Sequence, residues 1–431
     1  MASTSTSPGR GSREDSKKQM ILNAFVMNTP GHLSLGQWRH PRNKTDQYTK
    51  LSFWTDLAKL LDEAGFHAMF IADTLGRYDV HKGPAKAVPA LGSGAQFSVN
   101  DPLYLVPSMA AATRRLVFGV TASVTYEKPY SLARHLSTLD HLSEGCFAWN
   151  IVTSYLDSAA RNIGLSEQIP HDERYAIAHE YMGVMYKLWE GSFRDDAVVA
   201  DRETGVYIQP DARTPLLFQA GVSEAGNGFG GKHGEAIFVG GQTPEPTRIV
   251  VDNLRAVAAA EGRRPEHVKI LVAMTVIVAA TDEEVERTRQ DHLKYVDEEG
   301  ALALFVGWTG IDLAGYPDDA DFSLLSEAPR VQSVVRQWSA TVPGTEDLPW
   351  AKRHIVEYLS LGGLMAKALR RYYRVFIAGA AGEGALQRSW RWVGGVTARE
   401  VFFGLKRLPD DHPGSHYKWR AGEEIPAYQE K

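Results

Sequence analysis

The stretch Trp149-Asn150-Ile151-Val152-Thr153-Ser154, together with the later run His171-Asp172-Glu173-Arg174-Tyr175, decides the predicted fold. The first stretch ends an apolar segment, Cys146 to Val152, and the second opens a strongly patterned helix. A buried strand that ends in Asn, Thr and Ser, followed by a helix start rich in hydrogen-bond donors, is typical of an α/β barrel that binds a phosphate-bearing cofactor. The two motifs therefore predict a phosphorylated cofactor.

Strand-like and helix-like segments alternate around these motifs, from residue 21 to about residue 298. The segments with strand character are 21–28, 66–72, 116–123, 146–152, 216–219, 235–239 and 268–279. The segments with a helical spacing of apolar residues are 51–64, 102–112, 130–142, 174–189, 224–233, 249–261 and 282–298. Strands that are apolar along their whole length indicate a parallel sheet buried on both faces. The alternation predicts an α/β protein with a TIM-type (β/α)8 barrel rather than an open doubly wound sheet.

The chain divides into a tail, one barrel and a C-terminal part. Residues 1–20 are rich in Ser, Thr and Gly and lack the apolar segment of a secretory signal, so we expect a disordered tail. Residues 21–406 are expected to form a single barrel, and residues 407–431 a C-terminal extension. Insertions into the barrel are expected at about 76–100, 191–213 and 300–345.

The pattern is less regular after residue 300. Residues 306–340 are rich in Gly, Asp and Ser and are predicted to be loop with short helices. Residues 351–373 have a helical pattern, and residues 375–378 are a candidate eighth strand that would close the barrel.

Composition excludes several classes of partner. The net charge of -5 is mild and spread out, so neither nucleic acid nor an anionic membrane is expected as a partner. The apolar run from Ile270 to Ala280 is too short to cross a membrane. The single cysteine, Cys146, rules out a disulfide within the chain and fits a reducing, cytoplasmic compartment. We interpret Cys146 as a small buried hydrophobe rather than a nucleophile.

Polar residues lie where the predicted strands end, and in a barrel such residues face one shared mouth. They are Asn28, Asp73, Thr121, Asn150, Thr153 and Ser223. Almost all are neutral hydrogen-bonding groups, which suit an aromatic heterocycle with a polar tail. We expect no metal, because His and carboxylate residues do not converge. Any one position is explained equally well as a strand cap or a turn residue, so the argument rests on their coincidence.

Two helix starts are candidates for binding a phosphate. Residues 219–223 end a strand and enter a Gly-rich segment, where backbone N–H groups and the Ser223 hydroxyl suit phosphate oxygens. An ordinary Gly-rich turn explains the same pattern. His171 and Tyr175 are four residues apart on one helix and suit an anion contact. The alternative is a plain helix start whose acidic residues, Asp172 and Glu173, complement the helix dipole.

In this order, the residues resemble the bacterial luciferase-like flavin monooxygenases, in the branch with nitrilotriacetate, dibenzothiophene-sulfone and long-chain alkane monooxygenases. The resemblance covers about residues 21–300, with a short return at 407–412. The matching pieces are residues 23–28, 31–32, 38–41, 70–73, 100–103, 137–143, 149–154, 159–162, 171–175 and 219–223.

The resemblance implies a monooxygenase that uses reduced FMN, supplied by a separate NAD(P)H-dependent flavin reductase. Oxygen would add at the flavin C4a position, and the hydroperoxide would oxygenate a small organic substrate in a dry pocket. The barrels often pair, so we expect a homodimer or homotetramer. The family's FMN contacts match Asp73, Thr121 and Asn150 near the ring and ribityl chain, and His171, Tyr175 and Ser223 near the phosphate.

Three further positions are candidate catalytic residues on the same resemblance. Tyr78 and Gln96 match pocket positions, and Tyr155 stands where the alkane-oxidising relatives have His. Thr29 likewise stands where those relatives have Cys. The two differences argue against a long-chain alkane as the substrate.

Two larger differences lie towards the C-terminus. A segment usual in the family is missing between Asp211 and Thr214, and residues 365–371 replace the family's Asp-Gly-Phe-Asn closing strand. The closing strand is therefore expected to be atypical, and we hypothesise an altered exon or gene model. Two alternatives stay open: a deazaflavin-dependent oxidoreductase on the same barrel, or a flavin-binding paralogue without turnover.

Overall fold

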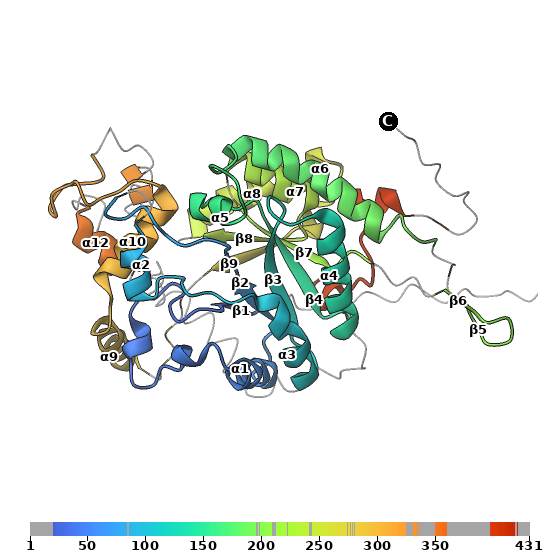
Figure 1. Cartoon of the computed structure of the whole chain (residues 1–431), viewed down its shortest axis with the longest axis horizontal. Coiled ribbons are helices and arrows are strands. Elements are labelled where there is room, and N and C mark those ends of the chain that lie inside the picture. The colour runs from blue at the N-terminus through green and yellow to red at the C-terminus, as the bar shows by residue number, and fades with distance from the viewer. Residues whose placement is uncertain are drawn as a thin grey trace, which may run out of the picture.

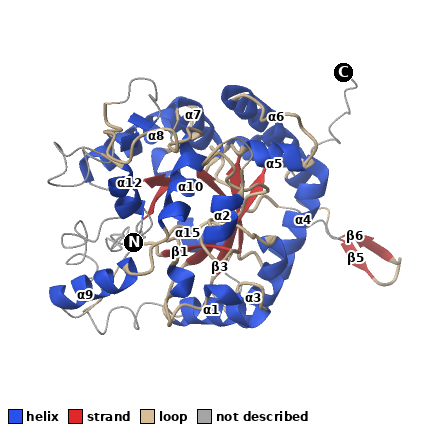
Figure 2. Ribbon diagram, turned by 60° about the vertical axis from the view of Figure 1, so that its left-hand side comes forward, coloured by secondary structure: helices blue, strands red, loops and turns tan. Residues whose placement is uncertain are grey.

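A computed structural model describes residues 20–83, 86–194, 197, 199–208, 213–221, 223–240, 244–273, 275, 277, 279, 281–324, 331–332, 334–335, 350–359, 397–418 and 420. In these residues a seven-stranded parallel sheet, in the order β1-β2-β3-β4-β7-β8-β9, forms a nearly closed barrel (Figures 1 and 2). Its strands are β1 (Asn23–Met27), β2 (Ala68–Ala72), β3 (Val117–Ser123), β4 (Phe147–Val152), β7 (Leu216–Ala220), β8 (Ala236–Gly240) and β9 (Lys269–Ala273).

Helices surround the sheet, as expected for parallel strands joined by helical crossovers (Figure 1). They are α1 (Leu51–Glu63), α2 (Val88–Ser93), α3 (Val106–Ala112), α4 (Pro129–Leu142), α5 (Asp157–Asn162), α6 (His171–Trp189), α7 (Glu224–His233), α8 (Pro244–Ala260), α9 (Asp282–Leu293), α10 (Glu298–Thr309), α12 (Lys352–Leu359) and α15 (Ala398–Phe403). Short 3-10 helices are η1 (Gln37–Arg39), η2 (Thr45–Gln47), η3 (Pro102–Leu105), η4 (Pro265–His267) and η5 (Pro413–Tyr417).

The TIM-type α/β fold is confirmed. Each of the predicted apolar segments up to residue 273 contains a strand of the sheet, and the strands pair in parallel in the predicted sequence order. The candidate eighth strand at 375–378 and the atypical stretch at 365–371 lie outside the described residues.

Aromatic side chains fill the interior of the barrel. Phe70 on β2 lies 4.3 Å from Phe238 on β8, measured between ring centroids, and Phe218 on β7 meets Phe238 edge-on at 5.5 Å. Gly119 on β3 makes room for them, because a Cβ there would lie 2.6 Å from the Phe218 ring. Phe402 of α15 packs against Phe218 at 5.4 Å. These rings form an apolar floor in the barrel, and the polar residues Thr121 and Asn150 lie nearer the carboxyl ends of their strands.

The helices after β9 differ from the prediction. The expected helix over 282–298 is divided, since α9 ends at Leu293 and α10 begins at Glu298. The segment predicted from residue 306 as loop with short helices begins with the last turn of α10, which continues to Thr309. Asp297 caps this helix by accepting from the Gly300 N–H at 2.8 Å, and Gly310 ends it in a left-handed conformation. The sequence pattern hid α10 because the helix is apolar on nearly all sides, as buried helices are.

The predicted insertions contain secondary structure of their own. The insertion at 76–100 includes α2, which packs against α10. The insertion at 191–213 includes an antiparallel hairpin of β5 (Val199–Asp201) and β6 (Val206–Ile208), which projects from the body (Figures 1 and 2).

A buried ion pair joins the C-terminal helix α15 to the barrel. The Arg399 guanidinium donates to Glu235 at 2.7 Å and to the carbonyls of Thr214 and Pro215. Burial alone would raise the pKa of Glu235, but Arg399 outweighs it and holds this pKa below its usual value. The carboxylate therefore stays charged and the pair stays intact at neutral pH. Residues 408–417 also pack on the body, with His412 fully buried and bonded to the His233 carbonyl at 3.0 Å.

No helix in the described ranges has both the length and the apolar character needed to span a lipid bilayer.

We predict that Arg399→Ala lowers the free energy of unfolding by about 3–5 kcal/mol, because Glu235 is left buried and unpaired. Urea unfolding monitored by circular dichroism measures the change. Arg202→Ala, at an exposed position, is the control and should stay within about 0.5 kcal/mol of the parent. An equal effect of the two substitutions would contradict this role for the ion pair.

Candidate active site

The strand pairing brings Thr121 and Asn150 together at the mouth of the barrel. Thr121 on β3 lies opposite Asn150 on β4, and the Asn150 Nδ2 amide donates to Thr121 Oγ1 at 2.9 Å. Both side chains are buried. The Asn150 Oδ1 atom is buried and has no hydrogen-bond partner. Since such a group costs free energy in a folded protein, Asn150 is poised to accept a donor from a bound molecule.

Two more polar atoms at this end of the barrel are also buried without a hydrogen-bond partner. Asn28 Oδ1 and Thr29 Oγ1, directly after β1, are buried without a hydrogen-bond partner. Asn28 is one of the strand-end residues that the sequence predicts for the site, whereas Thr29 is a position where the chain differs from its alkane-oxidising relatives. Together with Asn150 they make a polar lining above the aromatic floor, which suits a polar ligand better than an empty cavity.

The predicted phosphate-side residues also meet. Ser223 caps α7 by accepting from the Gly226 N–H at 3.1 Å, and its Oγ lies 3.3 Å from His171 Nε2 on α6. His171 Nδ1 lies 2.7 Å from Asp172 Oδ1. A carboxylate only accepts, so we assign the imidazole proton to Nδ1. In a neutral imidazole Nε2 then accepts from Ser223, and together they form a polar pair at the N-terminus of a helix.

Tyr175 lies between this pair and the strand end. Its ring lies 5.1 Å from the His171 ring. Gly221, just after β7, has no space for a side chain, because a Cβ there would lie 2.8 Å from the Tyr175 hydroxyl and 2.7 Å from Gln219 Nε2. The missing side chain at Gly221 therefore lets two polar groups, the Tyr175 hydroxyl and the Gln219 amide, lie close to the backbone just after β7.

Asp73 stands apart from these contacts, directly after β2. Burial, and then the charge of Asp101, raises the pKa of its carboxyl from 3.8 to about 7. A carboxyl with a pKa close to neutral pH is partly protonated there, so it can donate a hydrogen bond as well as accept one.

The three candidate catalytic residues form one cluster. The Tyr78 hydroxyl donates to Gln96 Oε1 at 3.0 Å and lies 2.8 Å from the Tyr155 hydroxyl. Gln96 adopts a left-handed backbone with φ of 49°, and Ser154, the residue before Tyr155, has φ of 58°. Non-glycine residues in this conformation gather at functional sites.

Trp308 completes this cluster and was missed in the sequence. Its Nε1–H donates to the Tyr78 hydroxyl at 3.0 Å, from the last turn of α10. The apolar run 301–308 between Asp297 and Gly310 was the available signal for a capped helix. The surrounding Gly, Asp and Ser obscured it.

Cys146 is not a nucleophile in this site. Burial, and then Asp140 and Glu144, raises the pKa of its thiol to about 11, so the thiolate is not populated at neutral pH. Within the described ranges, no group of His, Cys, Asp and Glu residues is arranged to hold a metal ion.

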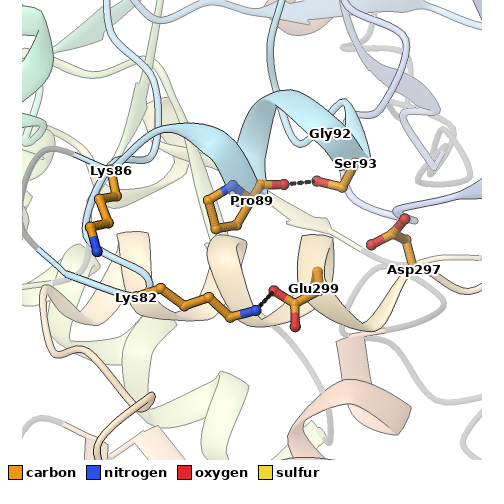
Figure 3. A pocket seen from close by; sticks show the side chains of 7 residues that line it. All are labelled: Lys82, Lys86, Pro89, Gly92, Ser93, Asp297 and Glu299. Atoms are coloured by element: carbon orange, nitrogen blue, oxygen red, sulfur yellow. Dashed lines mark hydrogen bonds and ion pairs between the residues drawn. The ribbon is translucent and has the colours of Figure 1, made fainter.

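A cleft of about 590 Å³ lies outside the mouth, between α2 and the start of α10 (Figure 3). Its lining includes Lys82, which forms an ion pair with Glu299 at 2.6 Å, and Ser93, which donates to the Pro89 carbonyl at 2.7 Å. None of the predicted site residues lines it. We therefore place the candidate active site at the strand ends, where Asn28, Thr29 and Asn150 each have an unpartnered buried oxygen.

Comparison with known proteins identifies the family. The model of the luciferase-like monooxygenases matches residues 33–341. The chain belongs to this family. It is 41% identical over 372 residues to dimethyl-sulfide monooxygenase of Hyphomicrobium sulfonivorans, covering 81% of this chain and 76% of that one. It is 38% identical over 435 residues to long-chain alkane monooxygenase of Geobacillus thermodenitrificans, covering 93% and 98%.

Solved structures agree with this membership of the luciferase-like monooxygenases. The crystal structure of DmoA from Hyphomicrobium sulfonivorans superposes with a TM-score of 0.82 at 35% identity, covering 93% of this chain and 96% of that one. Long-chain alkane monooxygenase gives 0.78 at 36% identity, with coverages of 93% and 100%. A riboflavin lyase solved with modified FMN and riboflavin gives 0.75 at 29%, also covering 93% and 100%.

We predict that Asp73→Asn stabilises the protein at high pH only. Between pH 4 and 7 the folded state keeps a proton that the unfolded chain loses, so this carboxyl destabilises the fold progressively as pH rises through that window. The free energy of unfolding should exceed that of the parent by about 1–4 kcal/mol at pH 8 and match it near pH 4. Urea unfolding across this pH range tests it, with the exposed Asp56→Asn as control. A difference that does not change with pH would contradict the raised pKa.

Proposed function

We propose that this chain is a two-component monooxygenase that uses reduced FMN and O2 to oxygenate a small organic substrate. The observation that carries the proposal is the unpartnered, buried Asn150 Oδ1 at the mouth, beside Thr121. A flavin ring offers N–H and carbonyl groups at its edge, so such an amide is a fitting partner for it. Family membership supports the same conclusion.

The residues of the helix starts fit the phosphate end of FMN. The Tyr175 hydroxyl lies close to the backbone of Gly221, and Ser223 and His171 already contact each other at the N-terminus of α7. Backbone N–H groups at a helix start attract anions, and a hydroxyl and an imidazole add directed bonds. We propose that Ser223, His171 and Tyr175 bind the phosphate, and that Asp73, Thr121 and Asn150 lie nearer the ring and ribityl chain.

Bound reduced FMN would supply the two electrons that activate O2. The chain's own contribution is position and the exclusion of water. The apolar floor of Phe70, Phe218 and Phe238 keeps water from the inner side of the mouth. Asp73, with its pKa raised to about 7, is able to hold a proton at a fixed atom near the cofactor. We propose Tyr78, Gln96 and Tyr155 as the polar wall on the substrate side.

The proposal includes a separate partner. Reduced FMN would come from an NAD(P)H-dependent flavin reductase. A relative, nitrilotriacetate monooxygenase component A of Aminobacter aminovorans, is by its name one component of a multi-component system. The single cysteine supports a reducing compartment such as the cytoplasm. Assembly as a homodimer or homotetramer stays part of this proposal.

We predict that the purified protein binds reduced FMN at micromolar or lower concentration. Ser223→Ala and His171→Ala should each weaken binding by roughly 1–3 kcal/mol, because each removes a charge-assisted bond to the phosphate. Anaerobic titration followed by flavin absorbance or fluorescence measures the affinity.

Thr281→Ala is the matched control for Ser223→Ala. Thr281 caps α9 in the same manner, accepting from the Glu284 N–H at 3.2 Å, so its loss also removes a helix cap. Its FMN affinity should equal that of the parent. No binding of reduced FMN by the parent would overturn the proposed function.

Oxygen uptake separates the remaining alternatives. With FMN, NADH and a flavin reductase, we predict that the protein increases substrate-dependent O2 consumption in a panel of organic sulfides, amines and hydrocarbons. Hydride transfer from a reduced deazaflavin without O2 uptake would favour the deazaflavin enzyme. FMN binding without oxidation of any panel member would favour the paralogue without turnover.

A further inference from the structure

The cluster around Tyr78 is an unbroken chain of hydrogen bonds whose proton positions follow from its two ends. At one end the Gln96 Nε2 amide donates to the His32 carbonyl at 3.0 Å. A carbonyl only accepts, so the amide nitrogen must face His32 and Gln96 Oε1 must face Tyr78. At the other side Trp308 Nε1–H, which only donates, points at the Tyr78 oxygen from 3.0 Å.

These two fixed groups determine what Tyr78 does with its single proton. Desolvation of the hydroxyl group raises the pKa of Tyr78 well above its ordinary value and also raises the pKa of Tyr155, although the Tyr155 side chain as a whole is only half-buried, so both hydroxyls are protonated at neutral pH. Gln96 Oε1 has no proton to give, so Tyr78 donates to it at 3.0 Å. Its oxygen then only accepts, from Trp308 and from the Tyr155 hydroxyl at 2.8 Å. Tyr155 must therefore donate inwards.

Tyr155 is the member of this hydrogen-bond chain that a bound molecule can reach. Its side chain is 50% exposed, and it follows the end of β4. With its proton committed to Tyr78, its oxygen has only lone pairs left for a bound molecule. We propose that Gln96 and Trp308 act as positioning residues that fix Tyr155 as a hydrogen-bond acceptor at the mouth, selecting a bound molecule with an N–H or O–H group. The inference deepens the proposed function and rests on it for the identity of the bound molecule.

The backbone around the chain is built to hold this arrangement. Gly307, next to Trp308 on α10, has no space for a side chain, because a Cβ there would lie 1.9 Å from the Tyr78 ring. About two turns earlier on the same helix, a Cβ at Gly300 would lie 2.7 Å from Ser93 of α2. Close approach at both glycines locks α10 against the segment that carries Tyr78 and Gln96. Trp308 therefore reaches Tyr78 from a fixed helix.

Paired probes of equal shape test the inference on the full-length protein loaded with oxidised FMN. The donor probe is 2-(methylthio)ethanol, and methyl propyl sulfide replaces its hydroxyl with a methyl group. Affinities are measured by calorimetric titration. In Tyr155→Phe the affinity of the donor probe relative to methyl propyl sulfide should fall about three- to tenfold, as expected for one lost hydrogen bond. Tyr104→Phe, at an 82% exposed tyrosine, should leave the ratio unchanged.

Gln96→Met should change the affinity for an acceptor-only probe, which a purely structural role of Gln96 would leave unchanged. Without the Gln96 acceptor, the Tyr78 proton turns to Tyr155, and the Tyr155 hydroxyl is released to donate outwards. The acceptor-only probe methylthioacetone should then bind about three- to tenfold more tightly than it binds the parent. Thermal unfolding of each variant confirms that it is folded.

The possible outcomes show whether the donor group belongs to the substrate or to the cofactor, and whether this inference or the proposed function fails. If the probe ratio is unchanged in Tyr155→Phe but reduced FMN binds that variant more weakly, the donor belongs to the cofactor. If neither the probe ratio nor the FMN affinity changes in Tyr155→Phe, the inference is overturned. It is also overturned if none of the probes binds. No gain for methylthioacetone in Gln96→Met overturns the direction assigned to the chain. If the parent binds no FMN, the proposed function fails, whereas the same probes on the unloaded protein still test the direction.

Discussion

The pairing of β3 with β4 is the constraint on which the site depends. It sets Thr121 opposite Asn150, so a hydroxyl and an amide meet at the carboxyl edge of the sheet and satisfy one another only in part. A slip of one residue in either strand would turn its polar side chain out of the barrel and separate the pair, because neighbouring residues of a strand face opposite sides. The buried Asn150 oxygen that remains is a cost in the folded protein without a bound molecule. Such a cost is what a preorganised binding site carries.

This polar edge has an aromatic ring cluster below it and the segment with Tyr78 and Gln96 beside it. Below it, the ring cluster of Phe70, Phe218 and Phe238 occupies the interior of the barrel. Beside it, the segment with Tyr78 and Gln96 is held by α10 through Trp308. In the proposed function, the strand ends would face the cofactor and the wall would face the substrate. The wall lies on an insertion and a late helix, which are free to vary without changing the barrel.

The barrel was predictable from sequence because its strands are apolar throughout and its helices have a regular spacing. The meeting of Thr121 with Asn150, and of His171 with Ser223, followed from placing each at a strand or helix end. The lack of a hydrogen-bond partner at Asn150 and Thr29, and the raised pKa of Asp73, were not predictable, because both depend on every neighbouring atom. Trp308 was missed because α10 lacks an amphipathic pattern, and local propensity cannot show which distant residue a buried helix meets.

The central claim is that the unpartnered amide oxygen of Asn150 binds the flavin, and Asn150→Leu tests it most directly. Leucine has a similar volume and no polar atom, so the protein without FMN should be as stable as the parent or more stable. Its affinity for reduced FMN, measured by anaerobic equilibrium dialysis, should be at least about tenfold weaker. Stability retained together with affinity lost is the result that we predict. An Asn150→Leu variant that binds reduced FMN as tightly as the parent would contradict the account.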